Sequence, residues 1–238
     1  MQEAAARKDA NKKLLEEVKS EREEYTETGD LPAIAPPKLR LHLTTARAEL
    51  EAAYLDAIKG FIKAKLDTEA AALEVSLANF RRRAWPHLDL KSVEIKDGFF
   101  RLEPQSQVST RKKYAGGVEI VVIARTEAEN IRLDAHQGAC VIFNWERNLS
   151  ELRVTRPDGN NRLESGSLAT AKVTPLKPNT WHMLKWRLTP TGMVVSVNGK
   201  VVFSEQRAYN LNAAAQISVR SEKSTVDVKE WSVKPIVK

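Results

Sequence analysis

The hydrophobic pattern of the chain changes its period at Pro86, and this change limits the folds that the chain can adopt. Before Pro86, apolar residues recur every three or four positions, as they do along one face of a helix. After Pro86, apolar and polar residues alternate, as they do along a strand with one buried side. All five tryptophans and eight of the ten glycines lie in residues 85–238. The sequence therefore predicts an α+β chain in which a helical part precedes an all-β part.

Two apolar stripes indicate that residues 38–84 are helical. The first stripe comprises Leu39, Leu43, Ala46, Leu50, Ala53, Ala57, Phe61 and Ala64, and the second comprises Leu66, Ala70, Leu73, Leu77, Phe80 and Ala84. The stripes are out of phase by about two residues, which a helix break at 65–67 with Asp67 or Thr68 as the N-cap would explain. We therefore expect a helical hairpin or coiled coil that acts as a stalk or an oligomerisation element. One long helix with a rotating stripe is the alternative.

Residues 1–37 have the composition of a charged helix followed by a proline-rich linker. Residues 2–26 contain strong helix formers but few apolar side chains, so a helix here needs a partner surface. Three prolines between Leu31 and Lys38 then prevent a helix from continuing.

Short strands separated by turn signals fill residues 85–238. Lys96-Asp97-Gly98 and Asn198-Gly199 are typical of hairpin turns, and residues 119–124 have the β-branched content of a buried strand. About ten to twelve strands can be counted, and no segment among them has the length and period of a helix. The even spacing of these strands predicts an antiparallel sandwich.

The net charge of +7 lies entirely in residues 85–238, because residues 1–84 hold 15 basic and 15 acidic side chains. The basic triplets at 81–83 and 111–113 have no aromatic residues interleaved with them, so nucleic-acid binding is not expected. No apolar run approaches the roughly 18 residues of a membrane span. The opening residues also lack the apolar centre of a signal peptide. A basic sandwich favours instead acidic polysaccharides or anionic cell surfaces.

The sequence shows no pattern of catalytic residues. Glycoside hydrolysis needs two carboxyl groups about 5–9 Å apart. Glu127 and Glu129 have a suitable spacing but fall in an expected turn, so a retaining glucanase is not expected. Cys140 begins an apolar strand, where a buried and inert thiol is expected. The four histidines lack metal-ligand spacing, and no glycine-rich phosphate loop occurs. We therefore expect neither catalysis nor a bound cofactor.

Three segments carry a resemblance to a known superfamily. Pro178-Asn179-Thr180-Trp181-His182-Met183-Leu184-Lys185-Trp186, the hairpin at 192–200 and the closing segment at 224–233 resemble the concanavalin A-like lectin/glucanase superfamily, which includes laminin-G-like and 3-keto-disaccharide hydrolase-type domains. A preceding helix of the type Ala53-Tyr54-Leu55-Asp56-Ala57-Ile58 resembles those of exported planctomycete-type bacterial proteins.

The resemblance implies an all-β jelly-roll of two curved sheets over residues 85–238. It also implies a secreted or periplasmic location, although the sequence itself leaves a cytoplasmic one open. Some relatives bind calcium, but the chain has no dense cluster of aspartate and asparagine of the kind that an oxygen-ligand site requires.

Alternation along three expected strands places six polar residues on one sheet face. If Ile131, Leu133 and Ala135 point into the core, the residues between them point outward, and polar residues of the next two strands lie beside them. The resemblance implies that the concave sheet carries the ligand. The candidate ligand-binding residues are Arg132, Asp134, His136, Asn144, Glu146 and Arg153. The alternative is a solvated face with cross-strand ion pairs and no ligand.

The tryptophans offer one further candidate. Trp145 has the ring that stacking on a sugar requires, but its alternation with Phe143 favours packing in the core. We expect Trp181, Trp186 and Trp231 to lie in the core as well.

These observations together predict a non-catalytic binding or adhesion module. Its ligand would be a carbohydrate or another, acidic, cell-surface molecule, and residues 38–84 would support a homo-oligomer. The alternatives are an enzyme similar to 3-keto-glycoside hydrolases with a diverged site, and a purely structural self-assembly protein.

Overall fold

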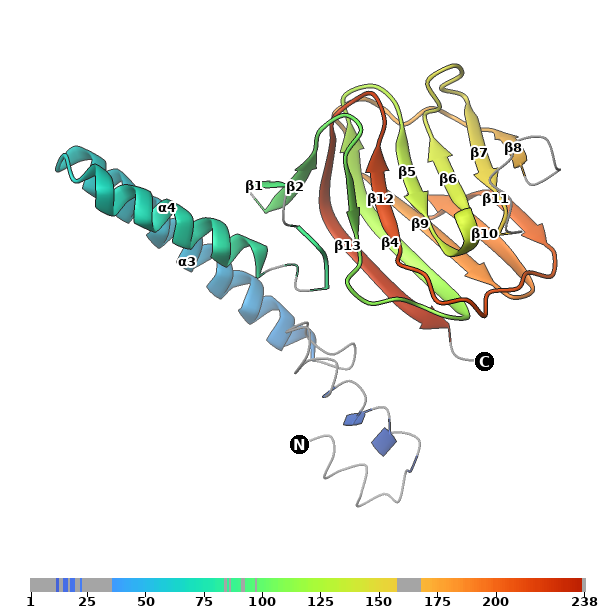
Figure 1. The fold of residues 1–238 in the computed structure, drawn as a ribbon, viewed down its shortest axis with the longest axis horizontal. Helices are drawn as coiled ribbons and strands as arrows, with labels where there is room; N and C mark the ends of the chain where they lie inside the picture. The colour runs from blue at the N-terminus through green and yellow to red at the C-terminus, as the bar shows by residue number, and fades with distance from the viewer. Residues whose placement is uncertain are drawn as a thin grey trace. The chain divides into compact units, whose positions relative to one another are not determined.

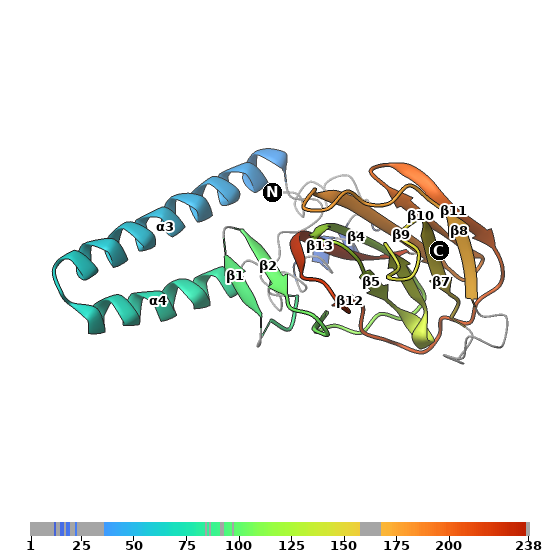
Figure 2. The same cartoon turned by 90° about the horizontal axis from the view of Figure 1, so that it is seen from above.

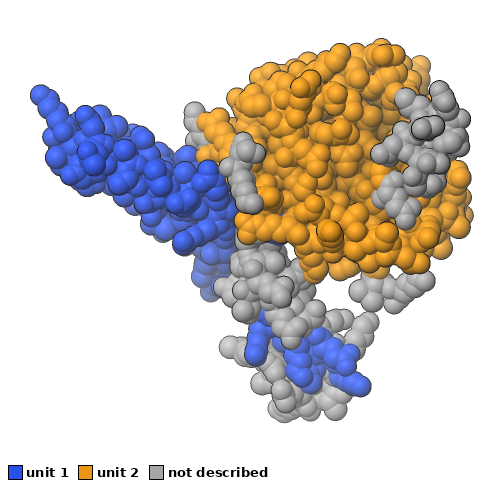
Figure 3. Space-filling model, viewed as in Figure 1, with its two compact units in different colours: residues 1–87 blue, residues 88–238 orange. Residues whose placement is uncertain are grey.

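The chain forms two compact units, residues 1–87 and residues 88–238, in the computed structural model (Figure 3). The structure describes residues 36–83, 85, 87–90, 93–96, 98–157 and 168–236, together with Lys12, Leu15, Glu16, Val18, Lys19 and Arg22. The charged helix and linker expected in residues 1–37 therefore lie almost entirely outside the described residues.

Two helices, α3 (Pro37–Lys63) and α4 (Asp67–Arg82), make up the described part of the first unit. They lie side by side in Figures 1 and 2, and the Arg81 guanidinium contacts the Glu51 carboxylate at 2.6 Å. The rings of Tyr54 and Phe80 also meet across the pair, 5.9 Å apart. The predicted break at 65–67 is confirmed, and the alternative of one continuous helix is wrong.

The predicted cap of the second helix is wrong. Leu66 occupies the N-cap position of α4 and makes no side-chain hydrogen bond there. Asp67 is instead the first helical residue, and together with Glu69 it places negative charge in the first turn. This charge stabilises the positive end of the helix dipole without a capping bond.

The second unit is a sandwich of two antiparallel sheets, as the strand spacing predicted (Figure 1). The seven-stranded sheet has the order β1-β2-β13-β4-β9-β10-β11, and the six-stranded sheet has the order β3-β12-β5-β6-β7-β8. The strands are β1 (Glu94–Lys96), β2 (Phe99–Leu102), β3 (Gln107–Ser109), β4 (Gly117–Thr126), β5 (Ile131–Asp134), β6 (Cys140–Phe143), β7 (Glu151–Thr155), β8 (Leu168–Lys172), β9 (His182–Thr189), β10 (Gly192–Val197), β11 (Lys200–Gln206), β12 (Ser218–Ser221) and β13 (Val226–Ile236).

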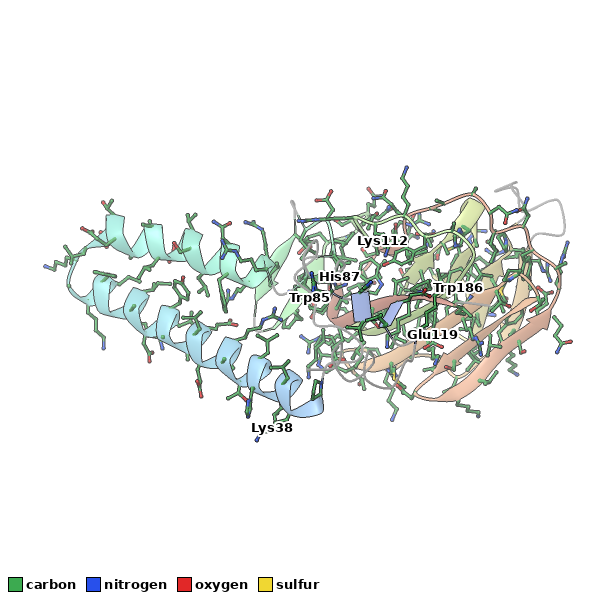
Figure 4. The ribbon with its side chains drawn as sticks, turned by 90° about the horizontal axis from the view of Figure 1, so that it is seen from below. Lys38, Trp85, His87, Lys112, Glu119 and Trp186 are labelled. Carbon is green, nitrogen blue, oxygen red and sulfur yellow. The ribbon has the colours of Figure 1, made fainter. Side chains whose placement is uncertain are left out.

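The core lies between the sheets because apolar side chains alternate along the central strands. In β4, the side chains of Val118, Ile120 and Val122 are fully buried, and the residues between them are partly exposed. Trp186, labelled in Figure 4, is also fully buried. Trp231 is 4% exposed, so the expectation that both tryptophans lie in the core is confirmed.

Gly192 begins β10 at a point where the backbones of β10 and β11 approach closely. Its φ angle is +157°, and a Cβ atom there would lie 2.4 Å from the carbonyl oxygen of Glu205. Since that oxygen belongs to the main chain, a side chain at this position forces the two strands apart.

We predict that Gly192→Ala lowers the free energy of unfolding by about 3 kcal/mol, measured by urea denaturation. Gly199→Ala is the control, because Gly199 has a φ angle of +82° but a methyl group added to it would have no atom within 4 Å. It should cost only about 1 kcal/mol of backbone strain. Equal losses in the two variants would contradict the proposed clash.

Candidate functional site

The candidate site lies on the outward side of the six-stranded sheet. Ile131 and Leu133 of β5 are fully buried in the core, as expected, and Arg132 and Asp134 between them point to the opposite side. We use the name polar face for the outward side chains of Arg132, Asp134, Trp145, Glu146, Arg153, Arg220 and Glu222.

The strand register aligns three arginines in one row across the polar face. Arg220 of β12 is paired with Arg132 of β5, which is paired with Ile142 of β6, and Ile142 is in turn paired with Arg153 of β7. Like charges on directly opposed strand positions repel, so this row requires neighbouring carboxylates.

Each arginine of the row has a neighbouring carboxylate, and Arg153 Nε lies 3.5 Å from Glu151 Oε1. Asp134 contacts Arg220 through both of its oxygens, each at 3.2 Å. Arg132 lies 3.2 Å from Glu222 and 3.5 Å from Glu146. These contacts hold the guanidinium planes in place on the sheet surface.

The carboxyl group of Glu146 is charged at neutral pH. Burial raises its pKa, but its own backbone N–H, the neighbouring Asn130 amide and the charge of Arg132 outweigh burial. The pKa of Glu146 is therefore lowered. Glu146 is a hydrogen-bond acceptor here and not a proton donor.

Trp145 lies at the end of the polar face and not in the core, so the prediction of core packing is wrong. Strand β6 ends at Phe143, and Asn144 has a φ angle of +49°. This left-handed residue breaks the two-residue alternation that placed Trp145 on the same side as Phe143. The Trp145 ring is partly exposed, and the guanidinium carbon of Arg153 lies 3.9 Å from its centroid.

Asn144 was expected on the polar face, but its side chain is buried. The residue is 2% exposed. Its Nδ2 donates to the carbonyl oxygens of Ala128 and Leu176, at 3.1 and 2.9 Å, and its Oδ1 accepts from the N–H of Leu176 at 2.7 Å. The amide therefore ties two loops together and is already occupied by the protein.

His136 is also buried instead of pointing outward. Strand β5 ends at Asp134, and His136 begins the short 3-10 helix η1 (His136–Gly138), so the alternation does not reach it. The ring is fully buried, with Nδ1 3.1 Å from the carbonyl oxygen of Ala213. Four of the six candidate residues thus lie on the polar face, and two do not.

The sequence-predicted candidates did not include Arg220 and Glu222, because the sequence does not show that β12 lies beside β5. Knowledge of that pairing, together with alternation along β12, would have identified Arg220 as a neighbour of Arg132 and Asp134.

Two further observations concern the described residues. They contain no group of three or more histidine, cysteine, aspartate or glutamate side chains that could hold a metal ion. Among the described helices, none is long and apolar enough to span a membrane.

We predict that Asn144→Ala lowers the free energy of unfolding by about 3 kcal/mol, because it leaves the N–H of Leu176 and two carbonyl oxygens without their partner. The measurement is urea denaturation followed by tryptophan fluorescence. Asn212→Ala, at an exposed position, is the matched control and should change stability by less than about 0.5 kcal/mol. If Asn144→Ala and the control have the same free energy of unfolding, the hydrogen bonds of Asn144 contribute little to stability.

Comparison with known proteins identifies similar folds and no close relative. The sequence matches no protein-family model and no curated protein. Among solved structures, the metal-free exoplasmic/lumenal domain of VIP36 is 10% identical with a TM-score of 0.49, over 65% of this chain and 87% of that one.

Two other solved structures differ in the function that their names state. The carbohydrate-binding module CBM66 from Bacillus subtilis is 9% identical with a TM-score of 0.46, over 60% of this chain and 91% of that one. A putative glycosyl hydrolase from Parabacteroides distasonis is 16% identical with a TM-score of 0.44, over 63% of this chain and 85% of that one. These matched structures are concanavalin A-like lectin/glucanase β-sandwiches. At these identities and TM-scores, the similarity does not determine a ligand or an activity.

Proposed function

We propose that the sandwich unit is a non-catalytic carbohydrate-binding module and that its polar face contacts the sugar. The observation that carries this proposal is the position of Arg153, whose guanidinium lies against the partly exposed Trp145 beside Arg132 and Glu146. An aromatic ring next to fixed planar donors and acceptors is an arrangement that suits a ring bearing hydroxyl groups.

The chemistry of the polar face favours binding through hydrogen bonds. The three arginines supply N–H donors, and Asp134, Glu146, Glu151 and Glu222 supply four carboxylates. Because the face has no excess of positive charge, it suits a neutral sugar better than a strong anion.

The same carboxylates favour binding over glycoside hydrolysis. Hydrolysis requires one carboxyl group that stays protonated at the working pH. Glu146 has a lowered pKa, and Asp134 is engaged by Arg220, so this pair supports a binding role. Turnover that is lost in Asp134→Asn or Glu146→Gln would support the alternative of a diverged 3-keto-glycoside hydrolase.

The test is a glycan array probed with the full chain and with Trp145→Ala and Arg153→Lys. We expect both substitutions to weaken binding by about tenfold, equivalent to about 1.4 kcal/mol. Arg187→Ala, an exposed arginine on β9 of the other sheet, is the control and should bind like the unsubstituted chain. Retained binding in both polar-face variants would exclude the polar face as the contact surface.

We further propose that the helical unit mediates self-association. Most of the exposed large apolar residues that the structure describes belong to the two helices and the turn between them. These residues are Leu39, Leu41, Leu50, Leu55, Ile62, Leu66 and Val75. Among the described side chains of these helices, only those of Ile58, Ala70 and Leu77 are buried. Apolar surface of this kind on a two-helix unit is typical of an interaction surface.

One side of α3 offers a continuous stripe for a second copy of the chain. Leu39 and Leu50, together with the exposed Ala46, Ala53 and Ala57, recur every three to seven positions and lie on one side of the helix. The predicted first stripe is thus only partly covered by α4. A second helical unit could cover the remainder, as in a helical bundle.

We predict that Leu50→Glu shifts the full chain toward the monomer, measured by analytical ultracentrifugation over a range of concentrations. Leu50 is 46% exposed, so a charge there does little to the folded monomer but is buried in an associated form. Leu41→Glu is the control because Leu41, 65% exposed, lies on the opposite side of the helix from Leu39. A chain that is monomeric before substitution would contradict self-association.

A further inference from the structure

A second cluster of charged and aromatic side chains lies on the outward side of the seven-stranded sheet. The register pairs Arg101 of β2 with Asp227 of β13, and Asp227 with Arg125 of β4. Asp227 accepts hydrogen bonds from Arg101 Nε at 2.7 Å and Nη2 at 3.0 Å, and from Arg125 Nε at 2.9 Å. Arg125 Nη2 also lies 2.8 Å from the same carboxylate.

Asp227 is more buried than the two arginines, and its hydrogen bonds hold them in position. Its side chain is 6% exposed, whereas those of Arg101 and Arg125 are 35% and 28% exposed. Burial raises the pKa of Asp227, but the hydrogen bonds from the two arginines outweigh burial and lower it. The carboxylate is therefore charged at neutral pH, and the two guanidinium groups lie above it toward the solvent.

Two aromatic rings complete the cluster. Trp181, directly before β9, lies with its ring 4.6 Å from the guanidinium carbon of Arg125, and the Phe99 ring lies 5.2 Å from the same atom. The two rings meet edge to face with their centroids 5.8 Å apart. Both residues are partly exposed, so the expectation that Trp181 lies in the core is wrong. We call Phe99, Arg101, Arg125, Trp181 and Asp227 the aromatic–arginine patch.

The patch keeps hydrogen-bonding capacity for a ligand. Arg101 and Arg125 each use Nε and Nη2 on Asp227, and within the described part of the chain Nη1 of each makes no hydrogen bond. The guanidinium group carries five N–H donors, so each arginine retains donors for a bound molecule. A purely structural ion pair on a sheet surface does not need two ordered aromatic rings beside it.

We propose that the aromatic–arginine patch is a second saccharide-binding site, separate from the polar face. The Trp181 ring would stack on the apolar side of a sugar ring, and the free Nη1 groups would donate to its hydroxyl groups. The nearby carboxylates of Glu103 and Glu127 act electrostatically on Arg101 and reduce the positive potential. This charge balance selects a neutral sugar over an anionic one.

A chain with both sites would have one on each outer surface of the sandwich. Two weak sites on one molecule raise the apparent affinity for a polymeric ligand through the effective concentration of the second site. The second site would bind the same class of ligand as the polar face, but the two sites share no residues. An experiment can therefore exclude one site without excluding the other.

The test measures binding of gluco-, manno- and galacto-hexaoses to the full chain by isothermal titration calorimetry, at saccharide concentrations up to the millimolar range. The patch variants are Trp181→Ala and Arg125→Gln, and the polar-face variants Trp145→Ala and Arg153→Lys are measured for comparison. Met183→Ala is the matched control, since Met183 lies two positions after Trp181 on the same outward side and is 39% exposed. Acrylamide quenching of tryptophan fluorescence provides a second readout, because a stacked sugar shields Trp181.

We expect at least one hexaose to bind and to protect tryptophan fluorescence from acrylamide. Trp181→Ala and Arg125→Gln should each weaken that binding about tenfold, whereas Met183→Ala should leave it unchanged. Chemical denaturation of each variant separates a loss of binding from a loss of folding. If Trp181→Ala does not fold, Arg125→Gln still tests the site, because glutamine keeps one amide donor for Asp227.

Three results would overturn the second site. They are the absence of binding by every hexaose, binding that is unchanged in both patch variants, and binding that is lost only in the polar-face variants Trp145→Ala and Arg153→Lys. The third result would leave the proposed function intact and remove the second site alone. Loss in the patch variants alone would instead assign saccharide binding to the seven-stranded sheet and remove it from the polar face.

Discussion

The sandwich depends on the alternation of side chains along paired antiparallel strands. In the seven-stranded sheet, β4 is paired along its whole length with β13 and along most of it with β9, so that Val118, Ile120 and Val122 face the core together with Trp186. Every second residue must then point outward. The polar face and the aromatic–arginine patch both depend on this constraint, because most of their residues are outward residues of strands whose inward residues form the core. Trp145, Glu146, Glu222 and Trp181 lie just beyond strand ends.

Ion pairing makes these outward surfaces ordered. Asp227 holds Arg101 and Arg125 on one sheet, and Asp134 holds Arg220 on the other. These ion pairs have a geometric effect, since a guanidinium group that is fixed by a carboxylate and lies against an aromatic ring presents its remaining donors in a defined direction.

Alternation along the sequence predicts the orientation of a side chain correctly for residues that lie within a strand. Arg132, Asp134 and Arg153 lie within strands, and alternation placed their side chains outward where the structure has them. His136 and Trp145 lie just beyond strand ends, at a 3-10 turn and after the left-handed Asn144, and their orientations were wrong. Trp181 precedes β9, and its outward position depends on Arg125 and Phe99, which are distant in the sequence.

The sequence by itself determined the division into a helical and an all-β part, the break between the helices and the inward positions of the strands, because these follow from local periodicity and turn chemistry. Only the tertiary structure decided which strands are neighbours. That choice aligned Arg220 with Arg132 and brought Asp227 between Arg101 and Arg125, across 126 and 102 positions of the chain. Pairing over such separations depends on how the whole core closes, and no local pattern of residues encodes it.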